Sequence, residues 1–192
     1  MGLGAADVDA LSEHVDWTSE LATEVERMGA SARPAHAVPV RPFLCARELL
    51  LRRGTTRADA HRTAAAAGFR LISEAELEWL LRNGGRDALV LGATPLPSVP
   101  GSVRFAPSRF GVQDLTVTQW AADDWFPSHD GATGTSAPRM GGDPAGVSRS
   151  TAPCDAFVNA GDLAFLLAAL RERGSERMPC AVRLVRELLV EA

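Results

Sequence analysis

Apolar residues recur in steps of three and four along the first part of the chain. The stripe runs through Val8, Leu11, Val15, Thr18, Leu21, Val25 and Met28. Side chains at this spacing lie on one face of an α-helix. The pattern predicts one amphipathic helix within residues 1–29, ending near Gly29, joined to a main domain of residues 30–192.

Residues 37–44 combine prolines with apolar side chains that roughly alternate. Proline lacks a backbone N–H and disfavours helix, whereas alternation is typical of a strand with one buried face. The pattern predicts an edge strand.

Two further helices are marked by their capping residues. Residues 56–67 have a helical composition, and either Thr55 or Thr56 can cap the start. Ser73 and Glu76 have the spacing of a capping box, in which each side chain satisfies a backbone N–H of the other. A helix is therefore expected from Ser73, with glycines ending both helices.

The stretch 86–160 is rich in Gly, Pro, Ser and Thr. Its short β-capable pieces are 89–91, 103–105 and 115–118. Long irregular segments are often binding loops held on a scaffold. Regular structure is expected again as a helix over 162–172 and a strand over 181–185.

Charge and hydropathy narrow the classes of partner. The 20 basic and 24 acidic residues are scattered and give a net charge of −4, without the basic stripe that tracks a phosphate backbone. No nucleic acid is expected. The longest apolar runs, such as 163–170, fall far short of the roughly 20 residues that a spanning helix needs. The chain also opens without a signal-peptide pattern, so we expect no membrane contact and a cytoplasmic location.

The three cysteines are Cys45, Cys154 and Cys180. Their odd number and wide spacing, with no C-x-x-C and no paired histidines, indicate neither a disulfide framework nor a zinc site. Reduced and mostly buried thiols are the simpler expectation.

Four blocks, in order, resemble the formylglycine-generating-enzyme (sulfatase-modifying-factor) superfamily. Residues 33–43 are similar to its P-x-H-x-V-x-V-x-x-F strand. Residues 58–60, 68–79 and 82–85 resemble its D-A, G-x-R-L-P-T-E-A-E-W-E and R-G-G signature. Residues 110–126 resemble its F-G-L-x-D-M-x-G-N-V-W-E-W-x-x-D-W block, and 140–142 with 182–186 its R-G-G and G-F-R-L-V-R.

The resemblance implies a fold class. Members have an α+β fold related to C-type lectins, with two main helices, small twisted antiparallel sheets and much irregular loop. The expected main domain, residues 30–192, would then be a compact and catalytically degenerate member of this superfamily.

The resemblance also implies copper chemistry that this chain does not match. Aerobic family members bind copper through two nearby cysteines after the R-G-G block, and soft thiolates suit Cu(I). Here residues 142–159 contain only Cys154, and Cys180 lies beyond a predicted helix. A copper site is not expected. Relatives with a histidine-bound iron would need clustered histidines, which here occur singly.

Calcium is a second feature of the family, held around the G-N-V-W-E-W turn. In this chain Val117, Thr118, Ala121 and Ala122 replace the Gly, Asn, Glu and second Trp of that turn, which removes some of the oxygens. A calcium ion needs six to eight oxygens. Asp114, Asp123 and Asp124 are weak candidate ligands, because acidic loop residues are more often simply solvated.

These observations favour a non-catalytic binding or accessory protein. Loops about 122–159 would hold a protein, peptide or small ligand, since aromatic and arginine side chains are common energetic anchors. The candidate contacts are Trp125, Phe126, His129, Arg139 and Arg149. Trp125 and Phe126 can equally be core residues.

Two other functions stay open. The first is a metal-dependent oxidase that modifies a cysteine in a peptide or sulfatase-like substrate, with Cys154 and Cys180 as candidate catalytic residues. The second is an interaction subunit that docks on a partner through the N-terminal helix.

Overall fold

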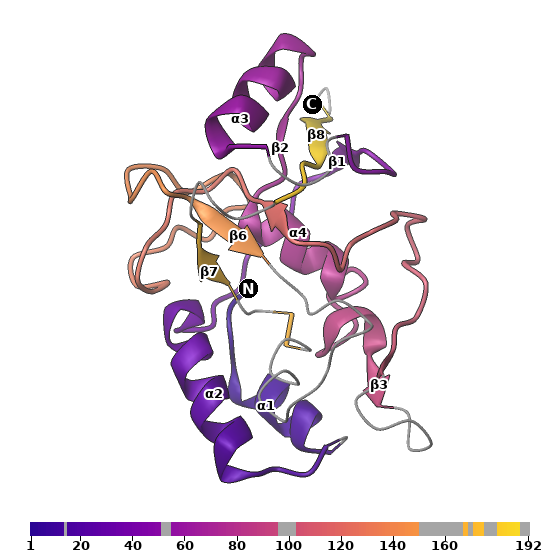
Figure 1. Cartoon of the computed structure of the whole chain (residues 1–192), viewed down its shortest axis with the longest axis vertical. Coiled ribbons are helices and arrows are strands. Elements are labelled where there is room, and N and C mark those ends of the chain that lie inside the picture. The colour runs from indigo at the N-terminus through magenta and orange to yellow at the C-terminus, as the bar shows by residue number, and fades with distance from the viewer. Residues whose placement is uncertain are drawn as a thin grey trace.

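The computed structural model describes residues 1–13, 15–50, 55–95, 103–149, 167–168, 171–174 and 180–188. It is an α+β protein. Its helices are α1 (Ala5–Ser12), α2 (Ser19–Gly29), α3 (Arg57–Ala66) and α4 (Glu74–Leu81), with 3-10 turns η1 (Ala30–Ala32) and η2 (Val90–Gly92). Figure 1 shows α1 and α2 at one end of the molecule, α3 at the other and α4 between them.

The N-terminal segment forms two helices, so the prediction of one continuous helix is wrong. Thr18 has an extended backbone (φ −87°, ψ 161°), and its side chain accepts a hydrogen bond from the backbone N–H of Leu21. A capping threonine starts a new helix, because it satisfies a donor that the first turn leaves free. The apolar spacing continues through both helices because Leu11 of α1 and Leu21 of α2 pack in the same cluster, together with Leu89 and Leu167.

Helices α3 and α4 begin where their sequence signals predict. The Thr56 side chain accepts from the backbone N–H of Asp59. Ser73 and Glu76 form the predicted capping box. Gly68, just beyond α3, has a φ of +74°, a left-handed conformation that glycine adopts without a side-chain penalty.

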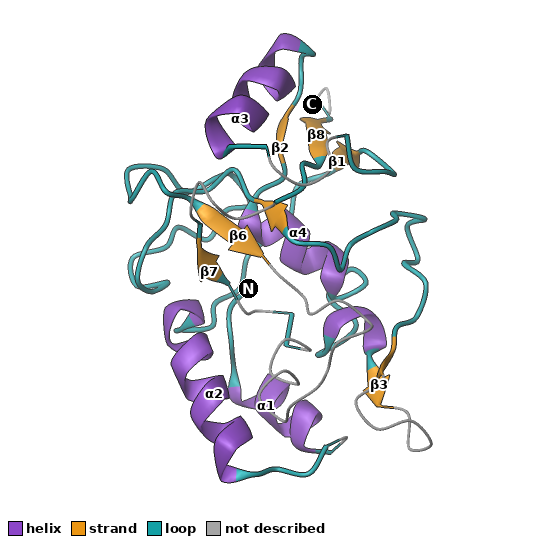
Figure 2. Cartoon of the chain, in the orientation of Figure 1, coloured by secondary structure: helices purple, strands orange, loops and turns teal. Residues whose placement is uncertain are grey.

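The described part of the chain also forms three small antiparallel sheets (Figure 2). The first has the order β1-β8-β2 and is formed by β1 (Phe43–Cys45), β8 (Leu184–Glu187) and β2 (Arg70–Leu71). The second pairs β3 (Thr94–Pro95) with β4 (Val103–Arg104). The third has the order β5-β6-β7, from β5 (Gln119–Trp120), β6 (Val147–Arg149) and β7 (Glu172–Arg173). Of the strand predicted over 37–44, only the last two residues are in a strand, as part of β1, which lies at the edge of the first sheet among the described residues.

Several predicted elements differ in the structure. Residues 89–91 do not form a strand: Leu89 forms an isolated bridge with Leu167, and Val90 and Leu91 belong to η2. Residues 115–118 form a turn before β5. The predicted helix over 162–172 lies mostly outside the described residues, and its last residue, Glu172, belongs to β7. The final strand begins at Leu184 rather than at Ala181. These short stretches carry little periodicity, so their tertiary partners decide their conformation.

The helix α4 lies at the centre of the core. Leu77, Leu80 and Leu81 pack in one cluster with Ile72 and Val185, which brings the first sheet against the helix. Among the described residues, no helix is both long and apolar enough to cross a lipid bilayer.

Candidate functional site

Asp123 ties the loop after β5 to the start of α4. Its carboxylate accepts hydrogen bonds from the backbone N–H groups of Glu74 (2.7 Å) and Arg139 (2.8 Å). Burial, together with the nearby charge of Glu74, raises the pKa of Asp123 from 3.8 to about 6. The side chain therefore joins three segments of the chain in a setting that disfavours its charge.

Arg57 of α3 holds the same loop from the other side. Its guanidinium donates to the backbone carbonyls of Ala122 (2.6 Å), Asp123 (2.9 Å) and Pro144 (3.0 Å). It also pairs with the carboxylate of Asp124 at 3.2 Å. The described loop 121–146 forms no strand. The charged hydrogen bonds from Arg57 help to fix its conformation instead.

The three calcium candidates are spread among these interactions. Asp123 and Asp124 are engaged by hydrogen-bond donors, and Asp124 also accepts from the backbone N–H of Gly141 at 2.9 Å. Asp114 is exposed and has a φ of 54°. Within the described ranges, no three His, Cys, Asp or Glu side chains gather as a metal site would require. A bound calcium stays a prediction from the resemblance.

The aromatic contact candidates are half-buried beneath arginines. The Arg171 guanidinium lies 4.7 Å from the ring centre of Trp125, and that of Arg139 lies 3.7 Å from the ring of Phe126. Such cation–π contacts are favourable, and they cover part of each ring. Arg139 also donates to the backbone carbonyl of Ser128 at 3.0 Å. These side chains hold the loop together before any partner binds.

His129 lies in a buried charged cluster rather than on the surface. His129, Glu74 and Arg171 are each 3% exposed. Arg171 Nε lies 2.8 Å from Glu74 Oε1, and His129 Nε2 lies 3.5 Å from the same oxygen. Arg171 also donates to the backbone carbonyl of Ser31 at 3.0 Å. The cluster joins α4 to the N-terminal helices through η1.

Three glutamates of α4 each bind a different arginine. Their sequence pattern indicates only favourable charge in the first turns of a helix. The structure buries all three carboxylates and pairs Glu74 with Arg171, Glu76 with Arg70 and Glu78 with Arg82. A spacing of two residues places successive glutamates on nearly opposite sides of a helix, which explains why they meet different partners.

Of the two cysteine candidates, only Cys180 lies among the described residues. Cys180 is fully buried in an apolar cluster with Trp120 and Val182. Cys154 lies outside the described residues. The backbone of Arg149, in β6, pairs with that of Gln119 in β5. The side chain of Arg149 is not among the described ones.

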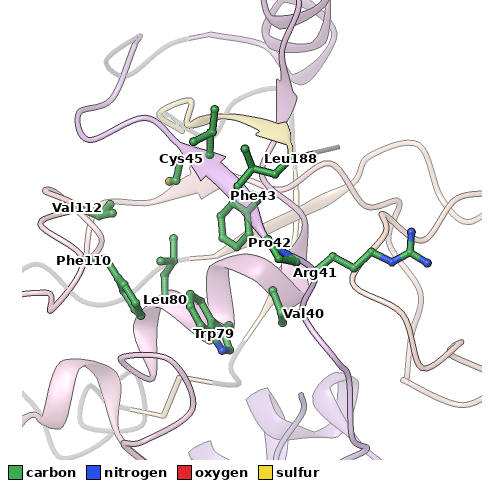
Figure 3. A pocket seen from close by; sticks show the side chains of 11 residues that line it. Val40, Arg41, Pro42, Phe43, Cys45, Trp79, Leu80, Phe110, Val112 and Leu188 are labelled. Atoms are coloured by element: carbon green, nitrogen blue, oxygen red, sulfur yellow. The ribbon is translucent and has the colours of Figure 1, made fainter. Parts of the chain in front are cut away.

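An apolar groove lies on the other side of α4, between β1 and the segment around Phe110 (Figure 3). Its volume is about 470 Å³, within the usual range for ligand sites. The lining residues are Val40, Arg41, Pro42, Phe43, Leu44, Cys45, Trp79, Leu80, Phe110, Val112 and Leu188. We refer to this set as the β1 groove.

Stacked aromatic rings form one wall of the β1 groove. Trp79 and Phe110 stack with their ring centres 4.7 Å apart, and Phe43 meets Trp79 edge-on at 6.1 Å. Aliphatic side chains remain open to solvent at its rim: Leu44 is 52% exposed and Leu188 is 44% exposed. An exposed apolar surface of this kind is typical of a contact site.

The half-buried thiol of Cys45 also faces the groove. Burial raises its pKa above the ordinary value, so the thiol stays protonated and acts as an apolar side chain near neutral pH. Nothing in the pattern of residues 40–45 predicts the groove, because its other walls come from distant parts of the chain.

Comparison with known proteins supports the fold but not an activity. The structure is similar to that of PvdO from Pseudomonas aeruginosa, with a TM-score of 0.52 and 21% identity. The likeness covers 71% of this chain and 61% of the PvdO chain. No protein-family model matches the chain, and no curated protein matches its sequence. At the level of fold, the likeness is consistent with the α+β scaffold that the motifs predict.

Proposed function

We propose that this chain is a binding protein that uses a formylglycine-generating-enzyme-like scaffold to hold an apolar part of a protein or peptide partner in the β1 groove. The observation that carries the proposal is the exposed apolar rim of Leu44 and Leu188 beside the stacked rings of Trp79 and Phe110. Burying one such leucine side chain contributes about 1.5–3 kcal/mol. Leu44 and Leu188 are about half exposed, so each would contribute part of this amount toward offsetting the entropy cost of association.

The loop 122–149 is the second candidate binding site. Trp125, Phe126 and Arg139 remain candidate contacts there, and the exposed side chain of Met140 lies close to them in sequence. Part of the surface of each ring is already covered by an arginine. In the β1 groove, Leu44 and Leu188 are 52% and 44% exposed, and these aliphatic side chains offer a partner more apolar area.

Selection from a random heptapeptide library displayed on phage tests the function. The immobilised full chain should enrich peptides with apolar residues. Leu44→Asp and Leu188→Asp should each weaken a selected peptide at least tenfold, because a tenfold loss needs only about 1.4 kcal/mol. Met140→Asp is the matched control, since Met140 is 63% exposed and outside the groove. It should change affinity less than twofold.

Two results would contradict the proposal. One is a library that yields no peptide above background. The other is a peptide that tolerates both groove substitutions but is lost in Met140→Asp, which would move the binding site to the loop 122–149.

A further inference from the structure

The register of the first sheet decides which backbone groups of β1 face outward. Leu44 is opposite Arg186 in an antiparallel pairing. Hydrogen bonds on either side run from Ala46 N to the Leu184 carbonyl (2.9 Å) and from Leu188 N to the Pro42 carbonyl (3.3 Å).

Hydrogen-bonded pairs alternate along an antiparallel ladder. Pro42, Leu44 and Ala46 therefore turn their backbone groups toward β8. Phe43 and Cys45 lie at the alternate positions, and their backbone N–H and C=O groups point away from β8.

The outer edge of β1 has no strand beside it within the described residues, because β1 is the last strand in the order β1-β8-β2. Among the described residues, the outward backbone groups of Phe43 and Cys45 have no backbone hydrogen bond. The next outward groups are already bonded, Arg41 N to Ser136 Oγ (3.2 Å) and Arg47 O to Gln113 N (2.8 Å), so the open edge is limited to residues 43–45. Unpaired donors and acceptors along a strand edge are a template for another extended chain.

The β1 groove follows this same edge. Six successive residues, 40–45, line it. Successive side chains of a strand point to opposite faces, and yet Phe43, Leu44 and Cys45 all border the groove. The groove therefore wraps around the strand edge, and Figure 3 shows Trp79 and Phe110 beside it.

We infer that the partner enters the β1 groove as an added β-strand, an extended segment that hydrogen-bonds to Phe43 and Cys45 and places alternate apolar side chains against Trp79 and Phe110. This rests on the proposed function and names the form of its partner. Main-chain hydrogen bonds provide affinity in this mode, and pockets for alternate side chains provide specificity.

The positively charged side chains around the β1 groove indicate which residues should flank the apolar positions of the partner segment. Arg41 lines the groove, and its guanidinium extends away from the aromatic side chains in Figure 3. Arg186 lies opposite the exposed Leu44, and the guanidinium of Arg109 lies 5.1 Å from the Phe110 ring centre. The carboxylate of Glu187 is 3.6 Å from Arg70, which is already paired with Glu76, so Glu187 keeps a negative charge. The three arginines outnumber this one carboxylate. Acidic residues should therefore flank the apolar positions of the segment.

N-methylation of a selected library peptide, one residue at a time, tests the strand directly. Each methyl group removes one backbone donor and leaves the side chains unchanged. In an added strand every second N–H points at β1. Affinity should fall about tenfold at alternate positions and less than threefold at the positions between them.

A substitution in the chain provides an independent test. Cys45→Pro removes an outward N–H, and proline is tolerated on edge strands where that group faces solvent. It should weaken the peptide about tenfold, whereas Cys45→Ala, which keeps the N–H, should change affinity less than threefold. Thermal unfolding of both variants checks that the fold is retained. The N-methyl series provides the test if Cys45→Pro does not fold.

The outcomes separate this inference from the proposed function. Peptides that bind in the groove but show no alternation on N-methylation would overturn the added strand and leave the binding function standing. A library that yields no peptide would overturn both. Concentration-dependent dimers in sedimentation, lost in Cys45→Pro but kept in Cys45→Ala, would show that a second copy of this chain occupies the edge and would overturn the partner segment.

Discussion

The backbone N–H of Glu74 donates a 2.7 Å hydrogen bond to the carboxylate of Asp123. This bond joins the first turn of α4 to the loop after β5, and the same carboxylate accepts from Arg139 N at 2.8 Å. The buried carboxylate of Asp123 thus fixes the position of the loop after β5 against α4. Because its pKa is raised, its protonation changes in the mildly acidic range.

Asp123 should make stability depend on pH in the mildly acidic range. Burial raises its pKa from 3.8 to about 6 in the folded chain. Between these values the folded state binds a proton that the unfolded state has released, so this group's contribution to the free energy of unfolding falls as pH rises. In urea denaturation from pH 4 to 7, the free energy of unfolding of Asp123→Asn should fall less, or rise more, with pH than that of the native chain, because other groups also titrate in this range.

The control for this experiment is Asp130→Asn, which changes an exposed aspartate in the same loop. It should keep the slope of the native chain. Asp123→Asn should also be less stable at pH 7 by about 1–3 kcal/mol, because one amide oxygen cannot satisfy both backbone donors equally well. Equal slopes for all three chains would show that Asp123 does not titrate as inferred.

Arg171→Ala should destabilise the fold strongly. It leaves the buried Glu74 carboxylate without its 2.8 Å ion-pair partner, and breaking a buried pair costs about 3–5 kcal/mol. Arg173→Ala is the matched control, because Arg173 pairs with Asp143 in an exposed setting and such pairs contribute about 0–1 kcal/mol. The midpoints of urea unfolding measure both. Similar small losses would contradict the burial of the cluster.

Two helix caps should differ in their contribution to stability. The Ser73 hydroxyl accepts from Glu76 N at 3.2 Å and donates to the Ser136 carbonyl at 2.7 Å, and it is buried. The Thr18 hydroxyl accepts only from Leu21 N among the described contacts, in an exposed position. We expect Ser73→Ala to cost about 2–3 kcal/mol and Thr18→Ala about 1 kcal/mol. Thermal unfolding midpoints in the opposite order would be inconsistent with the buried second bond.

Copper(I) titration tests the alternative of an oxidase. The reduced chain should not bind one Cu(I) tightly, because the family's cysteine spacing is missing and Cys180 lies in an apolar cluster. Cys154→Ala and Cys180→Ala are compared with the native chain, using a competing chelator to measure affinity. Tight one-to-one binding that is lost in both variants would favour the oxidase over the binding protein.

Local signals were enough to predict the starts of α3 and α4. Thr56, Ser73 and Glu76 act on backbone groups within four residues of themselves, so the interaction is encoded where it occurs. The same reasoning failed for the N-terminal helix. A periodic stripe does not reveal a break when both halves pack into one cluster, and the cap at Thr18 was read as part of the stripe.

The contact residues predicted in the loop 122–159 were chosen by side-chain type alone. His129 proves to lie inside the molecule, and the rings of Trp125 and Phe126 lie against arginines. Burial depends on segments brought together by the fold, which residue type does not report. The positions of Glu74, Glu76 and Glu78 predict only favourable charge in the first turns of α4, and the fold supplies the arginine that each one binds.

The sequence by itself determined where α3 and α4 begin, because capping acts between near neighbours in the chain. Its motifs also predicted an α+β scaffold, and the structure is consistent with that fold. The tertiary structure alone decided the Glu74–Arg171 pair and the β1 groove. A buried charge is stable only beside a partner that the fold supplies, and a groove exists only where distant segments leave space between them. Both depend on packing between residues that no local pattern connects.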